Sequence, residues 1–183
     1  MTGFGPHRWD ARVRALGWDA RVRALVPLAT ALVAVLADVL PLRDGASTGV
    51  TPLWTLCVAF FWSLYRPDLF GAGAAFATGF ASDALAGLPL GLTSLVLLLV
   101  RHVVIAQHRF FVARSFPVIW CCFLLLAAAA LLLRWALCCL WWGRLFAPQS
   151  MALELLLTLA VYPVATLLLA QVHNRIPRTI DAS

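Results

Sequence analysis

The sequence predicts an all-α integral membrane protein with six transmembrane helices. Apolar residues make up 63% of the 183-residue chain and charged residues 12%, with a mean hydropathy of +0.91. This composition is far from that of a soluble domain. The apolar residues gather in long runs separated by short polar gaps, as in a multi-pass protein. No gap could hold a folded domain, so we expect the protein to act within the bilayer or through its helix surfaces.

Before the first apolar run lies an Arg-rich segment, residues 1–24, which we predict to be cytoplasmic. It contains a tandem repeat of period nine, in which Trp-Asp-Ala-Arg-Val-Arg-Ala-Leu begins at Trp9 and again at Trp18. Each copy places Trp, Val and Leu on one helical face. The segment is therefore either an amphipathic anchor on anionic lipid or a basic tail that keeps the N-terminus in the cytoplasm.

A single six-helix transmembrane domain is predicted over residues 25–172, followed by a short cytoplasmic tail, 173–183. A bilayer requires about 20 apolar residues for each span. The third run is weakly apolar and the fifth is long enough to tilt, so five spans remain an alternative to six. The candidate spans are residues 25–42, 51–66, 69–87, 89–106, 117–142 and 150–172.

Arginine residues in the polar gaps predict the orientation. All fourteen basic residues are Arg, and with both termini inside, the cytoplasmic side holds most of those in the gaps, as the positive-inside rule requires. The net charge of +6 is explained in this way, so we expect no nucleic-acid partner. The cytoplasmic residues are Arg8, Arg12, Arg14, Arg21, Arg23, Arg66, Arg109, Arg114, Arg175 and Arg178; Arg43 and Arg144 are outside.

The third span carries a stripe of small residues and one acid, each four residues from the next. Small residues let helices approach closely in lipid, and a carboxylate there should face protein or water. We therefore predict a seam for helix packing and partner binding. Its residues are Gly71, Ala75, Gly79, Asp83 and Gly87.

Four charged residues are expected in the outer half of the bilayer: Asp38, Asp83, Arg134 and Glu154. One interpretation is an outer-leaflet polar cluster in which Arg134 pairs with Glu154 and Asp83 faces a cavity or a partner. The other is that Arg134 and Glu154 reach separately to the interface, while Asp38 only ends its helix.

Catalytic and metal-binding patterns are not found in the sequence. It has no metalloprotease, nucleophile-elbow or phosphate-loop motif. All five Cys residues lie in apolar runs without metal-ligand spacing. We predict no catalytic residue, no cofactor and no metal.

Motifs in the second to fourth spans resemble those of the bacterial rod shape-determining protein MreD family, over about residues 50–172. In order, they are Pro52, the run Phe61-Trp62-Ser-Leu-Tyr65-Arg66-Pro67, then Phe76, Gly79, Asp83 and Gly87, and finally Pro89-Leu90-Gly91. We add Trp62 and Pro67 to the candidate partner-binding residues. The Arg-rich repeat and the Cys- and Trp-rich fifth span depart from the family pattern.

The resemblance implies a non-enzymatic component of the bacterial inner membrane that supports lateral peptidoglycan synthesis. It also implies association with MreC and, through MreC, with MreB, RodA and a class B penicillin-binding transpeptidase. Membrane lipids are the other expected partners. We expect the second and third spans to form a groove for a transmembrane helix of MreC or of the transpeptidase.

The family is similar in fold to the substrate-binding subunits of energy-coupling-factor vitamin transporters. The alternative function is therefore a solute-binding transporter subunit. In that case Asp38, Asp83 and Glu154 would line an outward-facing pocket for a small polar or cationic solute.

Overall fold

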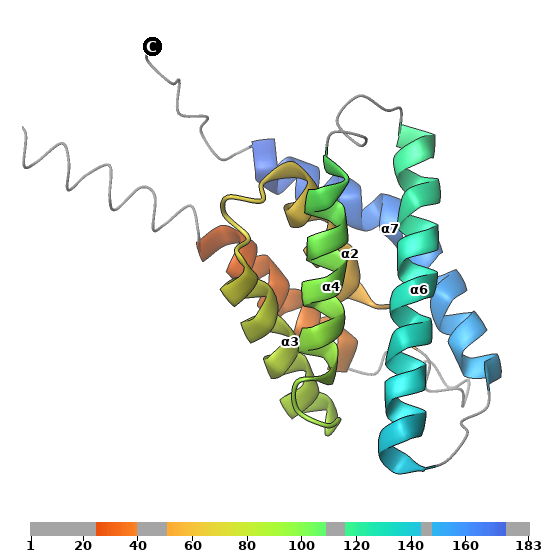
Figure 1. Ribbon diagram of the computed structural model, residues 1–183. Coiled ribbons are helices and arrows are strands. Elements are labelled where there is room, and N and C mark those ends of the chain that lie inside the picture. Colours follow the sequence, from red (N-terminus) through yellow and green to blue (C-terminus); the bar gives the residue numbers. More distant parts are fainter. Residues whose placement is uncertain (1–24, 40–50, 109–115, 144–147, 175–183) are drawn as a thin grey trace, which may run out of the picture.

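The computed structural model describes residues 25–39, 51–108, 116–143 and 148–174, and the regular structure within them is helical (Figure 1). The N-terminal repeat, the C-terminal tail from residue 175 and the expected outer residues Arg43 and Arg144 lie outside the described residues.

Six helices of twelve or more residues occupy the described ranges, one in each of the six predicted runs. The expected helix count is therefore confirmed. They are the first helix, Leu25–Val39, then α2 (Trp54–Tyr65), α3 (Ala72–Ala86), α4 (Leu92–Ala106), α6 (Phe116–Trp142) and α7 (Pro148–Asn174).

The helices differ in length more than the sequence suggested. Both α6 and α7 have 27 residues and are long and apolar enough to cross a membrane. By contrast, α2 has 12 residues and α3 and α4 have 15. At 1.5 Å per residue a helix of 12 residues rises only about 18 Å, against about 30 Å of hydrocarbon. The helices α2, α3 and α4 are thus shorter than the spans predicted over 51–66, 69–87 and 89–106.

Glycine and proline turns explain the short helices. The helix α2 ends just before Arg66 and Pro67, where the pre-proline residue disfavours helical geometry. Similarly, α3 ends at Gly87, which has a left-handed φ of 66°, a common helix stop. That the shorter helices also cross the bilayer remains a prediction.

The bundle is built around α2. All residues from 55 to 64 are buried, and α2 packs against both α4 and α7, while α6 packs on α4 and α7 (Figure 1). The ring of Phe60 meets Phe123 of α6 and Tyr162 of α7 at centroid distances of 5.1 and 5.9 Å, and Phe123 stacks on Tyr162 at 4.0 Å. Because this helix is enclosed on all sides, an apolar surface all round stabilises it.

Candidate functional site

The stripe on α3 packs against α4 of the same chain. A Cβ atom added to Gly79 would lie 2.4 Å from Cα of Ser94 and 2.5 Å from its backbone nitrogen. Contacts that short do not occur, so only glycine permits this approach of the two helices. Ala75, one turn earlier, is fully buried on the same face.

The carboxylate of Asp83 completes this interface by capping the start of α4. The backbone N–H of Gly91 donates to Oδ2 at 2.9 Å, and the N–H of Thr93 donates to Oδ1 and Oδ2 at 3.1 and 3.0 Å. The first N–H groups of a helix have no partner within the helix, and a negative charge there is favourable. Gly91, at the N-cap position, has no side chain that could accept these hydrogen bonds. Asp83 of the preceding helix accepts them instead.

The two end residues of the stripe, Gly71 and Gly87, do not pack closely against α4 as its middle residues do. Gly71 is the N-cap of α3 and Gly87 is its C-cap, and within the described ranges no other atom lies within 4 Å of a Cβ placed at either. Of the five predicted seam residues, three therefore form the contact with α4: Ala75, Gly79 and Asp83. Contact of these residues with a separate protein remains a prediction.

Trp62 is inside the bundle and is not on its surface. The side chain is fully buried, and its Nε1–H donates to Oγ1 of Thr30 on the first helix at 2.9 Å. Pro67 lies partly buried in the turn that connects α2 to α3. Trp62 therefore joins two helices of this chain, and its side chain is not accessible to a separate protein.

Asp38 repeats on α2 the arrangement that Asp83 makes on α4. Its Oδ1 accepts the backbone N–H of Trp54 at 2.7 Å and its Oδ2 accepts that of Thr55 at 3.1 Å. The preceding N–H, of Leu53, donates to Oγ1 of Thr158 on α7 at 3.0 Å. The partly buried Asp38 and the buried Thr158, from two other helices, thus satisfy the start of α2, and sequence reasoning did not identify Thr158.

Arg134 and Glu154 form an ion pair between α6 and α7. Their Nη2 and Oε1 atoms are 2.6 Å apart, and the side chains are 26% and 16% exposed. Pairing, and not separate snorkelling, is therefore the arrangement of these two residues.

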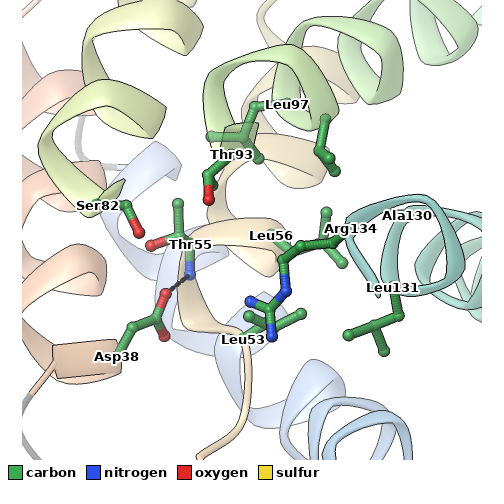
Figure 2. A pocket seen from close by; sticks show the side chains of 11 residues that line it. Asp38, Leu53, Thr55, Leu56, Ser82, Thr93, Leu97, Ala130, Leu131 and Arg134 are labelled. Carbon is green, nitrogen blue, oxygen red and sulfur yellow. Dashed lines mark hydrogen bonds between the residues drawn. The ribbon is translucent and has the colours of Figure 1, made fainter. Parts of the chain in front are cut away.

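The expected outer cluster of four charges is divided. Asp38 and Arg134 line one small cavity (Figure 2), whereas Asp83 is held at the start of α4 and is not among the residues that line it. Among the described residues, no group of three or more His, Cys, Asp or Glu side chains is placed to hold a metal ion.

The model of one protein family, the rod shape-determining protein MreD, matches residues 19–172. The match covers most of the chain. The chain belongs to the MreD family. The matched region, 19–172, begins within the second copy of the N-terminal repeat. The matched region is therefore longer than the region of about 50–172 that the motifs alone suggested. The Arg-rich repeat is therefore not wholly outside the MreD region.

Membership in the MreD family implies a role in rod shape determination and a place in a membrane. The family is a shape-determining structural component and is not a known enzyme family. No curated protein and no solved structure matches the chain. The expected likeness of MreD to energy-coupling-factor subunits therefore has no support in these comparisons.

Proposed function

We propose that this MreD protein is a non-enzymatic adaptor of the cell-elongation complex in the bacterial inner membrane. It binds a transmembrane helix of MreC, of the class B transpeptidase, or of both. RodA and MreB are joined to it through that complex, and both of its termini are cytoplasmic. The observation that carries this proposal is the outward face of α3.

The outward face of α3 has both small and aromatic side chains. Phe76 and Phe80 are 49% and 43% exposed, and their rings stack at a centroid distance of 6.1 Å. Gly73 and Ala77 are exposed beside them, and no atom of the other described residues lies within 4 Å of a Cβ placed at Gly73. Small residues allow a second helix to approach, and aromatic rings add contact area.

The opposite face of α3 supports this role by holding the helix in place. Gly79 packs on the backbone of Ser94, and Asp83 is bonded to the start of α4. A face held rigidly in this way loses less conformational entropy when it binds a partner. Binding would then select one arrangement of the partner and raise the population of that arrangement.

Two hollows among the described residues, one beside Asp38 and one between α4 and α6, give little support to the alternative of a solute-binding subunit. The cavity beside Asp38 has a volume of about 30 Å³, whereas small-molecule sites measure about 300–1,000 Å³. The hollow of about 360 Å³ between the start of α4 and the end of α6 is lined only by proline, leucine and tryptophan side chains. Those side chains offer no charge to a polar or cationic solute, so the adaptor is the better-supported function.

Site-specific photo-crosslinking in native membranes tests the proposal. A photoreactive phenylalanine analogue replaces Phe80 in one variant and Leu125 in the control. Leu125 is 72% exposed on α6. After illumination, antibodies against MreC and against the transpeptidase detect any adduct. We expect an adduct with one or both partners from position 80 and much less from position 125. Equal yields at the two positions, or no adduct with either partner from position 80 in membranes that contain all three proteins, would contradict the assignment of the α3 face.

A further inference from the structure

A small polar cavity lies where the first helix, α2, α3, α4 and α6 meet (Figure 2). Five polar side chains line it: Asp38, Thr55, Ser82, Thr93 and Arg134. Each comes from a different one of those five helices. The cavity is therefore a junction of the bundle, and it is separate from the outward face of α3.

Three hydroxyl groups at this cavity make no hydrogen bond of good geometry within the described part of the chain. Oγ1 of Thr55 is buried, and the group closest to serving as its partner is the carboxylate of Asp38, which also lines the cavity. Ser82 and Thr93 are 9% exposed, and within the described part of the chain the structure gives their hydroxyls no hydrogen bond; Thr93 is bonded only through its backbone N–H. A buried polar group without a partner is costly, and lipid around the protein offers no compensation.

Two opposite charges also face the cavity without touching. Figure 2 shows the carboxylate of Asp38 and the guanidinium of Arg134 on opposite sides of it. Both residues are described, yet the ion pair of Arg134 is with Glu154 and the hydrogen bonds of Asp38 are with the start of α2. A molecule that both donates and accepts hydrogen bonds could bridge this gap.

The volume of the cavity matches water. About 30 Å³ is available, and an internal water needs about 10–15 Å³ and two to four polar partners. The guanidinium of Arg134 disfavours a bound cation. We propose that the cavity holds one or two ordered water molecules, which bridge Asp38 to Arg134 and complete the hydrogen bonding of Thr55, Ser82 and Thr93. The site does not depend on the proposed partner.

Water-edited solid-state NMR of the full-length labelled protein in deuterated lipid tests this proposal. The experiment measures how fast magnetisation passes from water to individual side chains. Thr78 is the matched control, because it is buried on α3 one turn from Ser82, does not line the cavity, and donates its hydroxyl to the carbonyl of Ala74 at 2.8 Å. We expect transfer to Thr55 and Thr93 to be several-fold faster than transfer to Thr78. Equal, slow transfer to all three would show a dry cavity and overturn the proposal.

A filling variant gives a second readout. Ala130 lines the cavity from α6 and is 6% exposed, so Ala130→Leu places three further carbon atoms beside the proposed waters. In a variant that retains the wild-type spectrum elsewhere, transfer to Thr93 should fall to the level of Thr78. Unchanged fast transfer to Thr93 would mean that its water lies elsewhere, and the proposal would fail.

Discussion

The backbone N–H of Thr93 lies 3.0 Å from Oδ2 of Asp83, so a carboxylate near the end of α3 caps the start of α4. The turn between these helices is short, and the acid is fully buried. The contact fixes the register of the hairpin that presents the outward face of α3.

Replacement of Asp83 separates hydrogen bonding from charge. Asp83→Asn keeps one oxygen that can accept from Gly91 or Thr93, whereas Asp83→Leu leaves buried N–H groups without an acceptor, at about 1–3 kcal/mol each. We expect Asp83→Leu to lower the thermal midpoint in mild detergent much more than Asp83→Asn does. Asp68→Asn, in an exposed turn, serves as the control. An equal loss in both Asp83 variants, with the protein still inserted, would indicate a required negative charge.

Gly79 should be the least replaceable glycine of α3. An alanine there would place its Cβ against the backbone of Ser94, and overpacking of this kind costs about 1–3 kcal/mol. Gly73→Ala is the matched control on the same helix, since its Cβ would meet open space and alanine favours the helix. Unfolding free energies measured in bicelles should fall for Gly79→Ala and hold or rise for Gly73→Ala. Two unchanged values would show that α3 and α4 are not packed this closely.

A double-mutant cycle measures the pair of Arg134 and Glu154. Removal of either partner leaves the other charge without its ion pair, whereas removal of both leaves neither charge. We expect Arg134→Leu and Glu154→Leu each to destabilise the protein, and the double variant to recover most of the loss. The coupling energy should be about 1–2 kcal/mol. Additive effects of the two changes would mean that the 2.6 Å contact contributes nothing to stability.

Trp62→Phe tests the contact between the first helix and α2. The change keeps most of the buried volume but removes the Nε1–H that donates to Thr30, so we expect a loss of about 1 kcal/mol. Trp141→Phe is the control, because Trp141 is 73% exposed. Chemical denaturation followed by circular dichroism can compare the two variants. A larger effect at Trp141 than at Trp62 would contradict the packing of the first helix on α2.

Much of the helical layout could be predicted from apolar runs and turn residues. Gly87 and Pro67 indicated where α3 and α2 end, and a carboxylate on a stripe of small residues indicated that Asp83 faces protein. The pairing of Arg134 with Glu154 was one of two open alternatives. These inferences depend on local geometry and on the cost of charge in lipid, and both can be read from the order of residues.

The roles of Asp38, Asp83 and Thr158 as caps could not be predicted in this way. The N–H groups that need an acceptor are at the starts of α2 and α4. The acceptors come from near the ends of the first helix and α3 and from the interior of α7, which come near these N–H groups only in the folded bundle. Burial of Trp62 was missed for the same reason, because its partner Thr30 is 32 residues away in the chain. Periodicity also does not reveal whether a small-residue stripe faces the same chain or another protein.

The most direct test of the adaptor function is recovery of the tagged protein from its native membrane in mild detergent, with mass spectrometry of the proteins that remain bound. Three forms are compared: the wild type, the double variant Phe76→Ala and Phe80→Ala, and the control Leu125→Ala. We predict that MreC is recovered with the wild type and the control and is strongly reduced with the double variant. Recovery of a nucleotide-binding ATPase pair with no wall-synthesis protein would contradict the account and favour a transporter subunit.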